Sequence, residues 1–280
     1  MNNPKQISIL GCGWLGLPLA KYLASKGHKI KGSVRKKESL AELTRPSVQA
    51  YLLDVGSKKI TGNLSDFLKN SEILIISIPP RLRKQSSENF VDRIKIIVPH
   101  IEKSDIKKVL FISSTSVYAN DNSTVTEETC PMPETESGKQ LLASENILKE
   151  NSHFQTTIVR FGGLVGPNRH PVTSLAGKIN LKNPQAPVNL IHLDECIQII
   201  SNIIEQDKWS EVFNAVAPFH PTREIYYMEL AKSKGLTPPE FCHDFPSHGK
   251  TVSSKKIQQM LKYQYLNNSL GTDIKINNYG

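Results

Sequence analysis

Three glycines with the spacing Gly-x-Gly-x-x-Gly, at Gly11, Gly13 and Gly16, directly follow a short apolar run and precede leucines at helical spacing. The first glycine of such a loop permits a tight turn, the second lets a pyrophosphate approach the backbone, and the third allows close helix-to-strand packing. The pattern predicts a dinucleotide-binding loop that includes Trp14 and Leu15, with the Trp14 ring packed against a neighbouring strand. The alternative is that the glycines only shape a turn.

Short apolar runs alternate along the chain with stretches of helical periodicity. This rhythm predicts a doubly wound α/β (Rossmann) domain with a mostly parallel sheet, whose ligands sit beyond the carboxyl ends of the strands. The predicted strands span residues 5–10, 28–34, 49–54, 72–78, 108–113, 156–161 and 212–215. The predicted helices span residues 15–27, 38–43, 87–101, 138–150, 194–205, 222–234 and 253–261.

After about Gly162 the chain becomes rich in Pro, Gly and Asn, and its regular alternation loosens. We therefore expect a dinucleotide-binding domain at residues 1–161. Residues 162–280 are expected to form mainly a smaller substrate lobe, with some segments returning to the main sheet. A chain of 280 residues is long enough for one or two domains of this kind.

Cofactor choice depends on the end of the second predicted strand, where an acidic residue would bind the ribose of NAD. Residues 31–37 contain no acid, whereas Arg35, with Ser33 and Lys36, offers a charged fork for a 2′-phosphate. The sequence predicts NADP as the cofactor, with NAD less favoured. The alternative is a solvated strand end. Asp54, at the end of the third predicted strand, either borders the adenine or starts a turn.

Three further segments, at residues 111–118, 160–167 and 191–195, occur in the order and spacing of the extended short-chain dehydrogenase/reductase family. This family includes nucleotide-sugar epimerases and dehydratases, and the resemblance covers most of the chain. It implies that Ser113 and Gly162 lie near the cofactor. Extended members usually carry Gly-x-x-Gly-x-x-Gly, so the chain resembles an atypical, epimerase/dehydratase-like branch.

The resemblance also identifies the positions of the catalytic residues, which in this family are a serine or threonine, a tyrosine and a lysine. Ser114 matches the serine, but Ser137 and Leu141 stand where the tyrosine and the lysine belong. A serine is far less acidic than a phenol, and leucine carries no charge to lower a pKa. Lys139 lies on another face of the helix, and Ser137 could instead cap that helix.

Other polar residues offer substitutes for the missing groups. His192 could serve as a substitute acid or base, because histidine is the side chain best suited to proton transfer near neutral pH, although a histidine at a strand-to-helix junction is often bonded by the backbone. Arg169 and His170 lie in a Gly/Pro loop, where Arg169 could bind an anionic substrate or stay in solvent. We predict an oxidoreductase or an epimerase/dehydratase-like enzyme acting on a small polar or nucleotide-sugar substrate. The alternative is an inactive NADP(H)-responsive regulatory protein.

Composition narrows the classes of partner. The net charge is +9, and the basic residues are scattered along the chain except for two runs at residues 35–37 and 81–84. No aromatic residues are interleaved with them, as a face that binds single-stranded nucleic acid would require. No nucleic acid partner is therefore expected. The four cysteines lie far apart, and no metal site is expected. No apolar stretch approaches the roughly 18 residues that span a bilayer. With no recognisable signal peptide, we expect a cytoplasmic protein without a membrane partner. A homodimer is expected only by analogy with the family.

Overall fold

The computed structural model describes residues 4–44, 47–80, 89–266 and 270. The chain divides into two compact units. The first comprises Met1–Val117, Thr135–Arg160 and Ile200–Val212, and the second comprises Tyr118–Glu134, Phe161–Ile199 and Phe213–Gly280. The chain thus leaves the first unit at residue 161 and returns to it at residue 200, and residues 118–134 belong to the second unit. The basic run at residues 81–84 lies outside the described residues.

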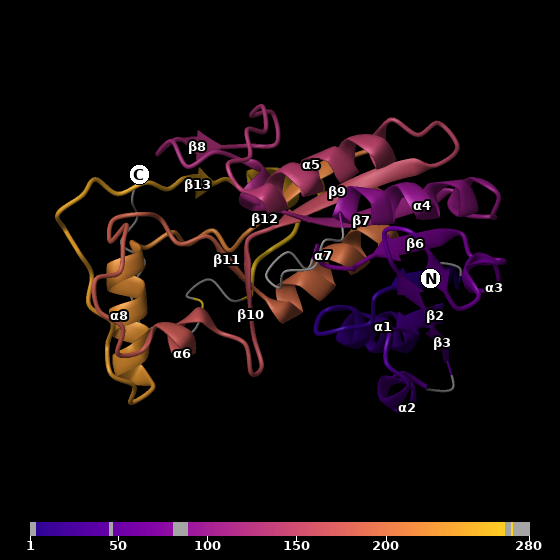
Figure 1. Cartoon of the computed structure of the whole chain (residues 1–280), viewed down its shortest axis with the longest axis horizontal. Helices are drawn as coiled ribbons and strands as arrows, with labels where there is room; N and C mark the ends of the chain where they lie inside the picture. The colour runs from indigo at the N-terminus through magenta and orange to yellow at the C-terminus, as the bar shows by residue number, and fades with distance from the viewer. Residues whose placement is uncertain (1–3, 45–46, 81–88, 267–269, 271–280) are drawn as a thin grey trace. The chain divides into compact units, whose positions relative to one another are not determined.

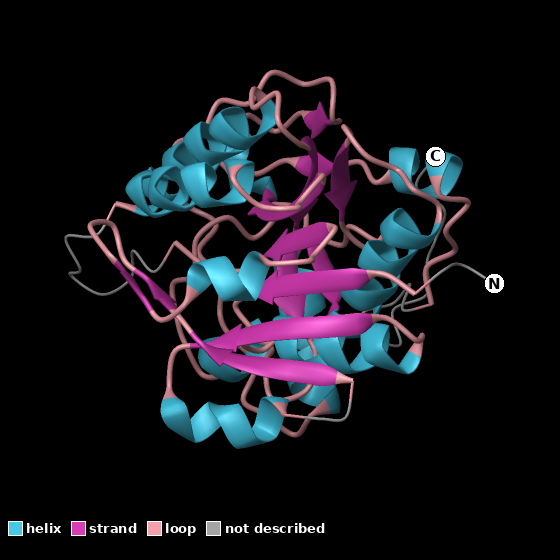
Figure 2. Ribbon diagram, turned by 90° about the vertical axis from the view of Figure 1, so that its right-hand side faces the viewer, coloured by secondary structure: helices cyan, strands magenta, loops and turns pink. Residues whose placement is uncertain are grey.

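A seven-stranded sheet with flanking helices dominates the fold, which is the predicted Rossmann-like α/β architecture (Figures 1 and 2). Its strand order is β12-β9-β7-β6-β1-β2-β3, and the pairs that join β3, β2, β1, β6 and β7 are parallel. The strands are β1 (Gln6–Leu10), β2 (Lys29–Val34), β3 (Val48–Leu52), β6 (Ile73–Ile76), β7 (Lys108–Ser114), β9 (Gln155–Phe161) and β12 (Val212–Ala215).

The strand order reverses at β1, whose two neighbours are β2 and β6. Open α/β sheets bind ligands at such a switch point, outside the carboxyl ends of the strands. The loop after β1 contains the three glycines, so the topology and the sequence motif indicate the same location for the site.

The helices around this sheet bury apolar side chains. Along α1, for example, Leu19, Ala20 and Leu23 are fully buried. The helices are α1 (Gly16–Ser25), α2 (Leu40–Leu43), α3 (Leu64–Leu68), α4 (Phe90–Glu102), α5 (Glu136–Lys149) and α7 (Leu193–Glu205), with 3-10 turns η1 (Lys37–Ser39) and η2 (Thr115–Val117). The described part of the chain contains no helix that is both long and apolar enough to cross a bilayer.

The third strand differs from its predicted bounds. It ends at Leu52, and Asp54 instead begins β4 (Asp54–Val55), which pairs antiparallel with β5 (Ile60–Thr61). The expectation that Asp54 closes the third strand is therefore wrong. A hairpin with two-residue strands is too short for apolar alternation to reveal.

The second unit is built from short elements around its own apolar core. They are β8 (Thr124–Val125), which pairs with β13 (Thr251–Val252), β10 (Gly163–Val165), which pairs with β11 (Leu190–His192), and the helices α6 (Pro171–Leu175), α8 (Arg223–Ser233) and α9 (Lys255–Met260). Helix α8 contributes Tyr226, Tyr227 and Leu230 to this core, which α6 also joins through Val172.

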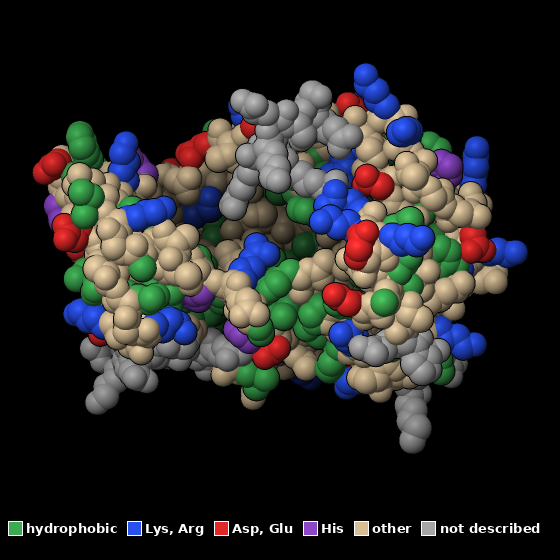
Figure 3. Space-filling view, turned by 60° about the horizontal axis from the view of Figure 1, so that its bottom comes forward, with side chains coloured by type: hydrophobic (Ala, Val, Ile, Leu, Met, Phe, Trp, Pro, Cys, Tyr) green, Lys and Arg blue, Asp and Glu red, His purple; other side chains and the backbone are tan. Residues whose placement is uncertain are grey.

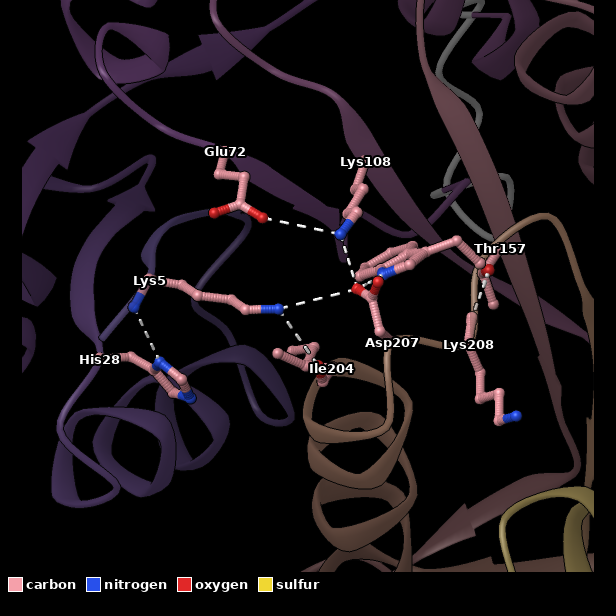
Figure 4. A network of polar contacts seen from close by, with 9 residues as sticks. Lys5, His28, Glu72, Lys108, Thr157, Ile204, Asp207 and Lys208 are labelled. Atoms are coloured by element: carbon pink, nitrogen blue, oxygen red, sulfur yellow. Dashed lines mark hydrogen bonds and ion pairs between the residues drawn. The ribbon is translucent and has the colours of Figure 1, made fainter. Parts of the chain in front are cut away.

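A polar network lies at the amino ends of β1 and β7, at the edge of the sheet opposite the glycine loop (Figure 4). The ammonium of Lys108 lies 2.6 Å from Asp207 Oδ1 and 3.7 Å from Glu72 Oε1. Lys5 Nζ lies 3.8 Å from the same Asp207 oxygen, to which Trp209 Nε1 donates at 2.7 Å. These contacts connect the start of two strands to the segment after α7. The network therefore lies at the amino ends of the strands, whereas the glycine loop lies at their carboxyl ends.

Candidate cofactor site

The three glycines of the loop differ in the space that the structure leaves for a Cβ. Gly11 has φ +103°, and a Cβ there would meet Ile78 Cγ2 at 2.9 Å and the backbone of Ser77 at 3.0 Å. A Cβ on Gly16 would overlap the carbonyl oxygen of Gly11. A Cβ on Gly13 would meet nothing within 4 Å. The first and third glycines therefore serve the fold, whereas open space over Gly13 fits a phosphate that approaches the backbone.

The loop is held against the end of β2 by two hydrogen bonds. Gly11 N–H donates to Ser33 Oγ at 2.9 Å, and Cys12 N–H donates to the Ser33 carbonyl at 2.7 Å. Ser33 is 2% exposed, so its hydroxyl supports the loop from inside. Leu15, at the N-cap position of α1, makes no side-chain cap hydrogen bond. The N-cap side chain therefore does not cap the N–H groups in the first turn of this helix, where a phosphate would bind.

Cys12 packs inward from the same loop. Its thiol lies 3.7 Å from the Ile9 carbonyl, and burial raises its pKa to about 12. A Cβ on Gly32 would meet Cys12 Sγ at 2.8 Å, so the small residue on β2 makes room for the sulfur. A neutral, buried thiol is a packing group and not a nucleophile.

A pocket of about 250 Å³ opens from this loop. Its wall consists of the glycine loop at residues 10–13, the end of β2 at 33–36, and two further segments at 53–55 and 77–79, together with Ser39 and Arg93. The cations Arg35 and Lys36 have exposed side chains at the end of β2, and the carboxylate of Asp54 is also exposed. Trp14 is half-buried, and Leu15 is buried behind the loop.

Arg93 is a pocket residue that the sequence analysis missed. It lies on α4, its side chain is 1% exposed, and its guanidinium lies 5.5 Å from the centre of the Phe90 ring. Nε donates to the Val55 carbonyl at 2.7 Å, and Nη1 donates to the Pro79 carbonyl at 3.1 Å. In the sequence, Arg93 lies on the same helical face as the apolar residues Phe90, Ile94 and Ile97. Spacing alone, however, cannot distinguish a buried arginine from one whose charged end reaches solvent.

At the end of β7, the Ser113 hydroxyl donates to Glu145 Oε1 at 2.5 Å. Glu145, on α5, is also bound by Arg160, whose Nε and Nη2 lie 3.1 Å and 2.6 Å from its two oxygens. All three side chains are buried. This two-point ion pair joins α5 to the sheet and engages the Ser113 hydroxyl inside the protein.

The residues aligned with the family's catalytic positions lie on elements that pack together, since α5 contacts both β7 and η2. Ser114 Oγ accepts a hydrogen bond from Ser116 N–H at 3.1 Å and is half-buried. Ser137 is half-buried in the first turn of α5, and Leu141 is buried one turn later. The capping alternative for Ser137 is wrong, because the Thr135 hydroxyl accepts from Gly138 N–H and caps this helix.

Four predicted site residues belong to the second unit. A Cβ on Gly162 would lie only 2.6 Å from the Asn189 carbonyl oxygen, so the close backbone contact requires a residue without a side chain. His192 Nδ1 accepts from Asp194 N–H at 3.3 Å at the start of α7. Arg169 is exposed in a tight turn, whereas His170 caps α6 through Nδ1 and contacts Tyr226 Oη through Nε2 at 3.0 Å.

Comparisons with known proteins identify the family of the chain. The NAD(P)H-binding family matches residues 11–187 of the chain. Protein YeeZ of Escherichia coli (strain K12) is 32% identical over 263 residues, which cover 93% of this chain and 96% of YeeZ.

Solved structures agree with the fold. UDP-glucuronic acid 4-epimerase from Bacillus cereus, in complex with NAD, superposes with a TM-score of 0.76 at 17% identity, covering 95% of this chain and 94% of its own. A functionally unknown conserved protein from Silicibacter pomeroyi DSS superposes with a TM-score of 0.77 at 19% identity, covering 95% and 96%. At these identities the likeness concerns the fold alone.

Proposed function

The chain belongs to the NAD(P)H-binding family, and from this premise we propose that it is an NADP(H)-dependent, atypical short-chain dehydrogenase/reductase. The observation that carries the proposal is the pocket beside Gly13, with open space over the loop and with Arg35 and Lys36 at its rim. Gly13 and the start of α1 would hold the pyrophosphate. A planar guanidinium at Arg35 suits a 2′-phosphate, and Lys36 adds a second positive charge.

NADP is favoured over NAD by the charges at the end of β2. An NAD site places a carboxylate here to accept from the ribose hydroxyls. In this chain the acid of the pocket is Asp54, which lies on β4 and not at the end of β2. A charge-assisted contact to the 2′-phosphate contributes about 1.5–3 kcal/mol, or roughly ten- to a hundredfold in affinity.

Arg35→Ala tests the assignment, with Lys37→Ala as its matched control. Lys37 is exposed two residues further along and does not line the pocket. Arg35→Ala should weaken NADP binding and leave NAD binding nearly unchanged, whereas Lys37→Ala should change neither strongly. Equal NADP affinity in Arg35→Ala and the wild type would contradict the assignment.

The proposed reaction is an oxidoreductase or epimerase/dehydratase-like conversion of a small polar or nucleotide-sugar substrate. A bound nicotinamide would accept or supply the hydride. Ser114, at the end of β7, would polarise the reacting oxygen of the substrate through its hydroxyl. In this proposal the half-buried Ser137 replaces a phenol, and the weakly acidic hydroxyl makes proton transfer slow.

A second function, NADP(H)-responsive binding without turnover, is favoured by Leu141. This side chain is buried on α5 and carries no charge where the family has its lysine. Absorbance at the nicotinamide band during incubation with nucleotide-sugars, carbonyl compounds and alcohols separates the two functions. Sustained turnover supports the enzyme, and binding of NADP(H) without turnover across the panel supports the regulatory protein.

We also propose that the partner is a small molecule and not a nucleic acid. On the face shown in Figure 3, Lys and Arg side chains are interspersed with acidic and neutral ones. A protein that follows a phosphate backbone needs a continuous basic stripe instead. A gel-shift assay with single- and double-stranded oligonucleotides at 150 mM salt should show no complex.

A further inference from the structure

Arg93 joins two separate parts of the pocket wall. Its Nε holds the carbonyl of Val55, on β4, and its Nη1 holds the carbonyl of Pro79, in the segment after β6. These residues are distant in the sequence, and both line the pocket. A guanidinium has its donors in a rigid planar fork, so it holds two acceptors at a defined separation.

The position of these carbonyls within the pocket indicates which part of the cofactor they face. The pyrophosphate is assigned to Gly13, and the 2′-phosphate is assigned to Arg35. The adenine is attached to the same ribose as the 2′-phosphate. The wall that these two assignments leave for the adenine is formed by residues 53–55 and 77–79 with Ser39 and Arg93.

We propose that Arg93 is a positioning residue for the adenine, setting the width of the slot between Val55 and Pro79. This inference rests on the proposed NADP(H) function. Arg93 therefore affects the affinity for every ligand that carries an adenosine, whether or not the ligand has a 2′-phosphate. Arg35, by contrast, acts only on ligands that have this phosphate.

The test is a calorimetric titration of four ligands, NADP, NAD, 2′,5′-ADP and 5′-AMP, into wild type, Arg93→Lys and Arg93→Met. Lysine keeps the charge and the aliphatic stem but cannot bridge two carbonyls as a planar fork does. Methionine keeps much of the apolar volume without the charge. In each variant the affinities for all four ligands should fall by a similar factor, about tenfold or more. The NADP-to-NAD affinity ratio should stay at its wild-type value.

Two controls separate this role from a merely structural one. Ile97→Val alters the buried face of α4 without touching the pocket lining, so it should lower Tm and leave all four affinities unchanged. Arg35→Ala should weaken NADP and 2′,5′-ADP but spare NAD and 5′-AMP. Loss of affinity for all four ligands in Arg93→Lys, at a temperature where the less stable Ile97→Val keeps its affinities, assigns the effect to the pocket and not to global stability.

The remaining outcomes also decide the question. Wild-type affinities in a folded Arg93→Lys would overturn the inference while leaving the proposed NADP(H) function intact. Failure of Arg93→Lys to fold even at 10 °C would overturn it too, because the arginine would then act through stability. Absence of binding of all four ligands to the wild type would overturn both the inference and the proposed function.

Discussion

Gly11 and Ser33 are joined by a hydrogen bond of 2.9 Å from the glycine N–H to the serine hydroxyl oxygen. The contact connects the half-buried first residue of the phosphate loop to the buried Ser33 at the end of β2. The Ser33 hydroxyl, which also lines the pocket, therefore supports the loop by accepting this hydrogen bond.

Ser33→Ala should therefore weaken NADP and NAD to a similar degree. Loss of one neutral hydrogen bond costs about 0.5–1.5 kcal/mol, and this cost falls on the loop that both cofactors share. Calorimetric titration of the two cofactors gives the affinities. A selective loss of NADP affinity would show that the hydroxyl contacts the 2′-phosphate directly.

The loop glycines should respond differently to the same substitution. Gly13→Val should fold with a Tm close to that of the wild type and bind neither cofactor, because its side chain would fill the open space over the loop. Gly16→Val should lose stability, because its Cβ overlaps the Gly11 carbonyl oxygen. Thermal unfolding and cofactor titration of both variants check the contrast. Unchanged cofactor affinity in Gly13→Val would mean that the glycines only shape a turn.

The Glu145–Arg160 pair should show strong coupling. Arg160→Met leaves a carboxylate buried without its guanidinium partner and should cost about 3–5 kcal/mol of unfolding free energy. The double variant Glu145→Leu, Arg160→Met removes both charges and should recover much of this loss. Urea unfolding of the two single variants and the double variant measures the coupling. Additive costs would show that the two residues do not act as a pair.

Acid should destabilise the second unit through His170. Burial, followed by the charge of Lys234, lowers its pKa from the ordinary 6.5 to about 4. The unfolded state binds the proton more readily than the folded state does. Neutral His170 therefore contributes its full share of the unfolding free energy above pH 6.5, and this share is lost as the pH falls from 6.5 towards 4. His170→Asn, which retains an N-cap side chain for α6, should lose less unfolding free energy than wild type between pH 7 and pH 4.5.

The pKa values of His28 and His220 are also lowered, mainly by burial, so part of the acid sensitivity should remain in His170→Asn. Urea unfolding of the variant and the wild type at pH 7 and pH 4.5 measures the unfolding free energy that each loses. An identical pH dependence in variant and wild type would contradict the assignment.

Tyr118→Phe should leave any turnover unchanged. The phenol is buried and donates to Asn214 Oδ1 at 2.9 Å, which makes it part of the packing of the second unit. The variant should lose about 1 kcal/mol of stability, the usual net contribution of a hydrogen bond. Turnover that disappears in Tyr118→Phe but persists in Ser137→Ala would show that Tyr118 supplies the proton.

The sequence predicted the main sheet because strands of four to seven residues and their helices show their periods clearly. β12, for example, matches its predicted bounds of 212–215. The two- and three-residue strands, such as β8 and β10, were missed because they depend on pairing with distant segments.

The glycine loop could be located from local spacing alone, but the buried contacts of the site could not. Arg93 reaches carbonyls of two segments that precede its helix, and Glu145 meets Arg160 across a gap of 15 residues. Such contacts arise only when the sheet brings these elements together. The charge of an isolated residue gives no indication of its partner.

Titration of the wild-type protein with NADP and NAD under identical conditions decides whether the pocket beside Gly13 binds NADP(H). Both cofactors should bind, and NADP should bind tighter by roughly ten- to a hundredfold through the charge-assisted contact at Arg35. Tighter binding of NAD, or no binding of either cofactor, would contradict this expectation.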